Sequence, residues 1–301
     1  MRKLGEYLLR GRIQAITVTG FLTLVSFLVP VFSWLLSGLP PGLVTLRKGP
    51  VTGLQVIIGS TLLIAVFALI AGMKPQIAVA VAIGIWLPVW CGCSVLRCTK
   101  SQGMAIVAAG ACGLVYILLM HGMLDDVTAW WQDWLEVWLE QTVTAQQGEQ
   151  FREVLMSAAP YVNAVMAIGL VTSLAITVLV ARWWQSLLFN PGGFRQEFHA
   201  LHLPRWLFIP VIAGVVMLLL DQAKPGSWVI DVLVLAVFLF LFQGLAMLHR
   251  IVAVKKLSPG WLAGMYVLLF VIPQVALFIA CLGMVDSWLM KAGPAAPNDN
   301  Q

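Results

Sequence analysis

Long apolar runs separated by short polar turns dominate this chain of 301 residues. Segments such as Ile77–Leu96, Met104–Met120 and Val229–Leu248 carry almost no charged side chain. As helices rising about 1.5 Å per residue, segments of this length cross a hydrocarbon core roughly 30 Å thick. The pattern therefore predicts an all-α, polytopic integral membrane helix bundle of about 8–9 transmembrane helices. The other spans are expected near Ile13–Leu39, Val51–Gly72, Tyr161–Leu188, Trp206–Leu220 and Trp261–Leu282.

Composition agrees with this class. Hydrophobic residues make up 60% of the chain and charged residues 10%, whereas a soluble domain carries about 25% charged residues. The basic start, Met1–Arg12, precedes an apolar run without a small-residue cleavage site, so we expect it to be a retained first helix. The net charge of +5 is divided among short loops. The lipid bilayer is therefore an expected partner, and nucleic acid is not.

The lysines and arginines sort onto one side of the membrane if residues 13–46 form a hairpin of two short helices bent near Pro30. With the N-terminus in the cytoplasm, 14 of the 18 lysines and arginines then lie inside, as the positive-inside rule requires. A single crossing by Ile13–Leu39 would weaken this bias. We therefore expect about nine helices, an N-terminus inside and a C-terminus outside. The exceptions on the outer side are Lys74, Arg152, Lys224 and Lys291.

The longest polar segment contains an amphipathic helix at Val127–Thr142. Trp130, Trp134 and Trp138 recur every four residues, and acidic side chains occupy the opposite face. Because tryptophan favours the membrane–water interface, we expect one interfacial helix lying on the outer surface, with these three rings toward lipid. Two roles stay open for it: closing the bundle, or acting as a lid or docking helix.

Polar side chains inside spans are the candidates for a substrate site, because their burial in lipid costs several kcal/mol. Asp231 lies about one turn into its span, where it serves either as an interfacial carboxylate or as a buried substrate or proton site. Asn163, Gln243 and Gln274 serve either interhelical hydrogen bonding or substrate contact. His121 ends its span and is expected at the interface.

The cytoplasmic segment 190–205 is the most specific stretch of the sequence. Its Pro-Gly-Gly turn is followed by aromatic and leucine residues alternating with charged ones. It is either a simple connector with a short amphipathic helix or a contact surface for a cytoplasmic partner. The candidate partner-contact residues are Phe194, Arg195, Phe198 and Arg205.

No arrangement of residues indicates catalysis or a cofactor. A P-loop, a GxGxxG fingerprint and an HExxH motif are absent from the sequence. Cys91, Cys93 and Cys98 lie at a helix end without a second cysteine pair or a nearby histidine, which matches no usual zinc spacing. We therefore expect a non-enzymatic protein with no metal and no cofactor.

Two stretches resemble known families. Ala181-Arg182-Trp183-Trp184-Gln185 and Asn190-Pro191-Gly192-Gly193-Phe194, with Gln243-Gly244-Leu245-Ala246 downstream, resemble the YybS-like bacterial membrane proteins, a family without an established function. This likeness covers nearly the whole chain. The stretch Leu39-Pro40 followed by Leu46-Arg47-Lys48-Gly49-Pro50-Val51-Thr52-Gly53-Leu54 resembles the second and third helices of S-components of energy-coupling-factor vitamin transporters. That likeness covers at most Met1–Leu188.

These resemblances imply a multi-pass protein of the bacterial inner membrane. They divide one membrane domain, residues 1–301, into a six-helix S-component-like part (1–189), three further helices (190–291) and a disordered tail (292–301). The leading hypothesis is a transporter-like protein that binds or transports a small vitamin-like solute. The alternative is a scaffold or assembly protein that engages a cytoplasmic partner through its basic loops. A membrane protein partner is compatible with both.

Overall fold

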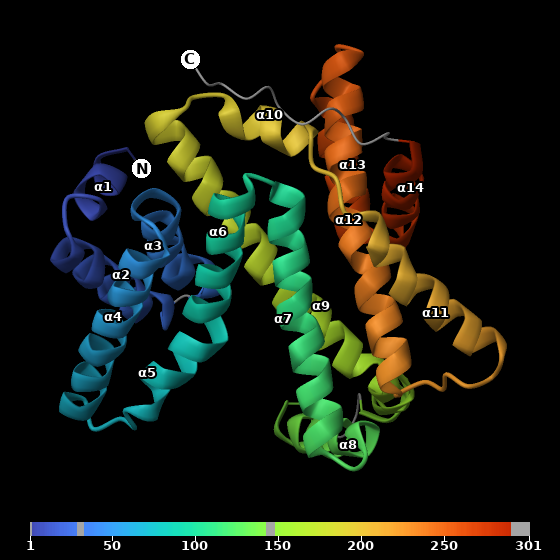
Figure 1. The fold of residues 1–301 in the computed structure, drawn as a ribbon. Helices are drawn as coiled ribbons and strands as arrows, with labels where there is room; N and C mark the ends of the chain where they lie inside the picture. The colour runs from blue at the N-terminus through green and yellow to red at the C-terminus, as the bar shows by residue number, and fades with distance from the viewer. Residues whose placement is uncertain (1, 29–32, 143–147, 290–301) are drawn as a thin grey trace.

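The computed structural model describes residues 2–28, 33–142 and 148–289, which form an α-helical bundle (Figure 1). The all-α fold predicted from the sequence is confirmed. The elements are α1 (Arg2–Leu8), α2 (Arg12–Ser26), α3 (Ser33–Lys48), α4 (Pro50–Ile70), α5 (Gln76–Val81), the π-helical turn η2 (Ala82–Trp86), α6 (Leu87–Thr99), α7 (Gln102–Met123), α8 (Val127–Thr142), α9 (Gly148–Phe189), α10 (Gly193–His199), the 3₁₀ turn η3 (Arg205–Leu207), α11 (Phe208–Leu219), α12 (Trp228–Val254), α13 (Gly260–Val271) and α14 (Val275–Leu289).

Five of the described helical segments are long and apolar enough to cross a membrane. Several others are apolar but shorter than the roughly 20 residues that a straight crossing needs. The five are Pro50–Ile70, Gln76–Thr99, Gln102–Met123, Phe151–Phe189 and Trp228–Val254.

Residues 13–46, predicted to form a hairpin of two short helices, lie mostly in α2 and α3. α2 and α3 pack against each other, and the hydroxyls of Thr23 and Ser37 lie 3.1 Å apart. The indole of Trp86, from η2, donates to Ser37 Oγ at 2.7 Å. These polar contacts join three helices inside an apolar environment, where hydrogen bonds between helices substitute for the hydrophobic effect. The bend expected near Pro30 lies outside the described residues.

Polar contacts also join the helix ends that lie near α10. We call this end of the molecule the α10 end of the bundle. Arg97 Nη1 donates to the carbonyl of Leu46 at 2.5 Å, and Gln185 Nε2 donates to the same carbonyl at 3.2 Å. Arg182 forms an ion pair with Glu197 of α10. The first two contacts use the carbonyl of Leu46, in the last turn of α3, where carbonyls have no partner within their own helix. Together these contacts fix α3, α6, α9 and α10 to one another.

The α8 helix lies at the opposite end, which we call the α8 end (Figure 1). It begins and ends where the tryptophan pattern predicted. One face, formed by Val127, Trp131, Leu135 and Leu139, is buried, and α8 packs mainly against α9. Trp130, Trp134 and Trp138 are 40%, 46% and 38% exposed. These rings are thus turned away from the bundle, which leaves them available to lipid.

The segment Trp261–Leu282 departs from the sequence expectation of one crossing. A turn at residues 272–274, which contains Pro273, divides it into α13 and α14. Proline removes a backbone donor and disfavours helical geometry before it. Asp286, near the end of α14, forms an ion pair with Arg250, near the end of α12. Both helix ends therefore lie at the α10 end, and the side of the membrane on which the C-terminus lies stays a prediction.

Two glycines allow α12 and α14 to approach closely. A Cβ at Gly283 would lie 2.1 Å from the carbonyl oxygen of Phe240, and a Cβ at Gly244 would lie 2.0 Å from that of Ile279. Neither backbone oxygen can move aside without moving its helix. The pair thus acts as a small-residue packing site of the kind that brings membrane helices together.

Gly283→Ala is expected to lower the free energy of unfolding by about 1–3 kcal/mol, because the added methyl group forces the two backbones apart. Gly169→Ala is the matched control, since a Cβ there meets nothing within 4 Å. Thermal unfolding of both variants in the same detergent measures the difference. Equal midpoints for the two variants would contradict the close approach.

Candidate functional site

A buried polar site lies near the α8 end, where α12 begins. The turn before α12 contains Gly226 with a φ of +84°, a conformation that favours glycine. Asp231 follows in the first turn of the helix, where the helix dipole favours a carboxylate. Its side chain is nevertheless 0% exposed. Burial of a carboxylate at this depth costs free energy that only its contacts can offset.

Three helices bring one polar side chain each to this site. His121 Nε2, from the last turn of α7, lies 2.8 Å from Asp231 Oδ2. Asn163 Nδ2, from α9, donates to the same oxygen at 2.6 Å. The structure thus brings together Asp231 and Asn163, two of the predicted substrate-site residues. It adds His121, which was expected at the interface. The side chain of His121 is mostly buried, with 18% of it exposed.

Two acceptor oxygens of this site have no hydrogen-bond partner among the described residues. They are Oδ1 of Asp231 and Oδ1 of Asn163, and both are buried. Buried polar atoms are almost always hydrogen-bonded, so such atoms mark places where a proton, a water molecule or a ligand group fits. His121 and Asp231 have no third histidine, cysteine or carboxylate grouped with them in the described part of the chain. What these side chains offer is hydrogen bonding and proton exchange.

Gln243 belongs to a second polar cluster, at the middle of α12. Its Oε1 accepts from the backbone N–H of Leu203 at 2.9 Å, and its Nε2 donates to Asp286 Oδ2 at 3.1 Å. Arg250 binds the other oxygen of Asp286 and donates to the carbonyl of His199 at 3.1 Å. Since these groups satisfy one another, the cluster holds helices together rather than offering free atoms to a ligand.

Gln274 does not meet the other predicted substrate-site residues. It lies in the exposed turn between α13 and α14, and the backbone N–H groups of Leu277 and Phe278 point to its carbonyl. The four candidates therefore divide into one pair, Asp231 with Asn163, and two separate positions. Their role in binding a substrate stays a prediction.

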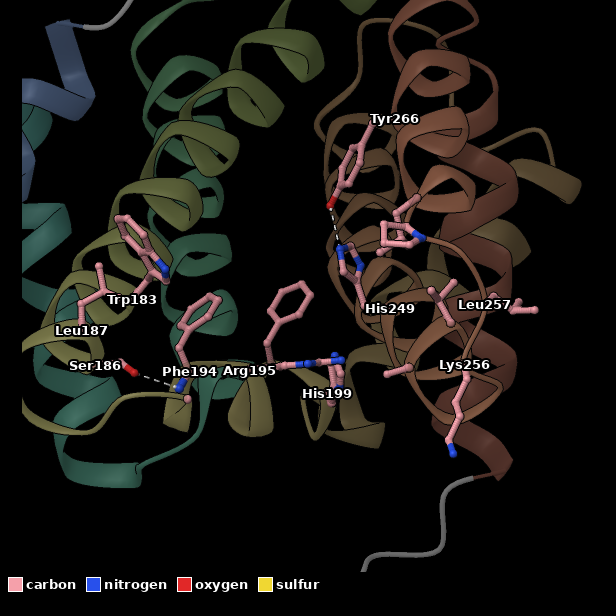
Figure 2. Close-up of a pocket in the computed structure, with 16 residues that line it drawn as sticks. Trp183, Ser186, Leu187, Phe194, Arg195, His199, His249, Lys256, Leu257 and Tyr266 are labelled. Carbon is pink, nitrogen blue, oxygen red and sulfur yellow. Dashed lines mark hydrogen bonds between the residues drawn. The ribbon is translucent and has the colours of Figure 1, made fainter.

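A cavity of about 740 Å³ lies at the α10 end between α9, α10, α12 and α13 (Figure 2). Of the four predicted partner-contact residues, Phe194, Arg195 and Phe198 line it. The rings of Phe194 and Phe198 stack with their centroids 5.9 Å apart. Arg205 lies elsewhere, where its Nη2 is 3.5 Å from the carbonyl of Trp288. The structure thus turns the aromatic residues of α10 inward. Their contact with a protein partner stays a prediction.

Basic and aromatic side chains form the polar part of this cavity. His199 and Arg195 come from α10, His249 from α12, Lys256 from the turn after α12, and Tyr266 from α13. Burial lowers the pKa of His199, and the charges of Arg195, His249 and Arg250 lower it further. A histidine with a lowered pKa is neutral near pH 7. Arg195 and Lys256 are therefore the permanent charges of the cavity.

Sequence reasoning overlooked Asp286 and underestimated His121. Asp286 is a carboxylate within an apolar helix and 5% exposed, so the rule that singled out Asp231 applies equally to it. It escaped notice because the last span was expected to end at Leu282. His121 was placed at the interface because it ends an apolar run. Only the packing of α7 against α12 shows that it faces a carboxylate.

The bundle of apolar helices and the polar groups enclosed within it define a polytopic α-helical membrane protein. Residues 15–287 match the DUF2232 family, described as a predicted membrane protein, and the chain belongs to that family. Searches among curated proteins and among solved structures each found no match.

Proposed function

We propose that this protein is a non-enzymatic, transporter-like membrane protein whose site at His121, Asn163 and Asp231 binds a proton together with a small solute. One observation carries the proposal: the carboxylate of Asp231 is fully enclosed, yet one of its oxygens has no partner among the described residues. Ionisable groups inside membrane bundles commonly belong to substrate pathways and proton relays.

The proposal has Asp231 and His121 share one proton. With Nε2 and Oδ2 2.8 Å apart, the proton can reside on either atom of the pair. Asn163 Nδ2 stabilises the ionised carboxylate by hydrogen bonding to the same oxygen. A solute that donates to the two unpaired oxygens would favour the ionised form of Asp231, and loss of that solute would favour the protonated form. Solute and proton binding are thereby linked.

The vitamin-like character of the solute rests on the likeness of the Gly49-Pro50-Val51-Thr52-Gly53 turn to S-components. In this structure Gly49 has a φ of +102° and Pro50 begins α4. We place the protein in the bacterial inner membrane with the α10 end toward the cytoplasm. The support is that Arg97, Arg182 and Arg250, which the positive-inside rule assigns to the cytoplasm, make their contacts at the α10 end.

Mass spectrometry of small molecules retained by the purified protein tests this proposal. Wild-type protein is expected to retain a solute of which Asp231→Asn retains at least about tenfold less, since a charge-assisted hydrogen bond contributes roughly 1.5–3 kcal/mol. Asp133→Asn is the matched control, because it removes an exposed carboxylate from α8 at the same end.

Two results would count against the proposal. The first is an identical set of retained molecules in wild-type protein and Asp231→Asn. The second is the absence of any retained solute together with reproducible copurification of a cytoplasmic protein, which would favour the scaffold alternative.

A further inference from the structure

The cavity at the α10 end combines an apolar interior with a positively charged rim. Trp183 and Leu187 of α9, Phe194 and Phe198 of α10, and Leu262 of α13 supply apolar surface. Figure 2 shows the side chains of α10 and those of His249 and Tyr266 on facing elements. Phe198 contacts the ring of His249 edge-on at 5.3 Å. Trp183 on one side of the cavity and His249 and Tyr266 on the other add further rings to its walls (Figure 2).

The charge of the rim is not neutralised from within. The 16 described residues that line the cavity include no aspartate and no glutamate. Glu197, the acidic residue of α10, turns instead to Arg182, with which it forms an ion pair. Arg195 and Lys256 form no salt bridge with any described residue. Two exposed cations thus stand beside an apolar cavity without a counter-charge.

We infer that this cavity binds an anionic phospholipid, with the phosphate at Arg195 and Lys256 and an acyl chain among the apolar side chains. The position supports this assignment. The cavity lies where α12 and its apolar run end, and Trp183 is a residue type that favours the interface. Basic pockets between membrane helices on the cytoplasmic side have the chemistry that anionic headgroups require. His199 and Tyr266 add donors for phosphate oxygens.

Binding of short-chain lipids to the full-length protein in uncharged detergent tests the inference. Dioctanoyl phosphatidylglycerol is expected to bind wild-type protein and to raise its unfolding temperature. The double variant Arg195→Gln/Lys256→Gln should bind it about 30-fold more weakly, since each basic residue near a membrane surface contributes a factor of roughly five. Ala253→Phe, which fills the cavity without changing charge, should also weaken binding.

The controls separate this site from general electrostatic attraction and from a free phosphate. Lys74→Gln/Lys224→Gln removes the same charge from exposed positions at the α8 end and should bind the lipid like wild type. Dioctanoyl phosphatidylcholine and glycerol 3-phosphate should bind far more weakly than dioctanoyl phosphatidylglycerol.

Three outcomes would overturn the inference. One is unchanged affinity for phosphatidylglycerol in Arg195→Gln/Lys256→Gln, which carries surface changes only. Another is unchanged affinity in Ala253→Phe, which would remove the cavity from the site. The last is equal affinity for glycerol 3-phosphate and the phospholipid, which would make the free phosphate the ligand.

Discussion

His121→Leu is expected to lower the free energy of unfolding by about 3–5 kcal/mol, because it leaves the enclosed carboxylate of Asp231 with Asn163 as the one side chain of the described residues that still hydrogen-bonds to it. Removing a single member of a buried pair costs more than the pair contributes, since the desolvation of the other member is no longer offset. Unfolding of the purified variant by a denaturing detergent gives the free energy.

The double variant His121→Leu/Asp231→Leu separates this cause from lost packing. With both partners removed, no uncompensated charge stays buried, so much of the lost stability should return. His202→Leu is the control, because His202 is an exposed histidine near the α10 end. A double variant less stable than His121→Leu would show that the pair is not the source of the effect.

Asp286→Leu is expected to cost a similar amount, about 3–5 kcal/mol, through a different cluster. The change removes the ion-pair partner of Arg250 and the acceptor of Gln243 Nε2. Arg250 would keep its bond to the carbonyl of His199, which does not neutralise its charge. The unfolding midpoint in detergent measures the loss.

The consequence of Asp286→Leu should extend beyond stability. Because the cluster fixes α14 against α12, proteolysis between α13 and α14 is expected to become faster in this variant. Glu140→Leu, at an exposed position of α8, should change neither property. If Asp286→Leu and Glu140→Leu unfold at the same midpoint, the cluster does not hold the two helices together.

The sequence predicted those features that depend on neighbouring residues. The helix Val127–Thr142 has the predicted bounds because its tryptophan spacing is local. The exposure of Trp130, Trp134 and Trp138 was predicted, whereas the burial of the row beside them was less foreseeable. Trp131, Leu135 and Leu139 pack inward while Trp130, Trp134 and Trp138 stay exposed. All six are apolar, so only the position of α9 decides which row is buried.

Features that depend on distant residues were harder to foresee. Asp231 and Asn163 were both candidates, but 68 positions separate them in the chain, and nothing local indicates that they touch. Pro273 could be read in the sequence, but the continuous hydropathy of Trp261–Leu282 led to the expectation of one unbroken span. Helix α9 begins at Gly148 rather than near Tyr161, because polar residues that suggest a loop also occur in a helix that extends past the membrane.

The most direct test of the central claim is infrared difference spectroscopy of the reconstituted protein between acidic and basic pH. The proton-binding site at His121, Asn163 and Asp231 predicts a C=O band from an enclosed protonated carboxylic acid. That band should disappear in Asp231→Asn, shift in frequency in Asn163→Ala through loss of a hydrogen bond, and persist in Asp133→Asn. A difference spectrum that is the same in wild-type protein and in Asp231→Asn would show that Asp231 exchanges no proton, and would contradict the account.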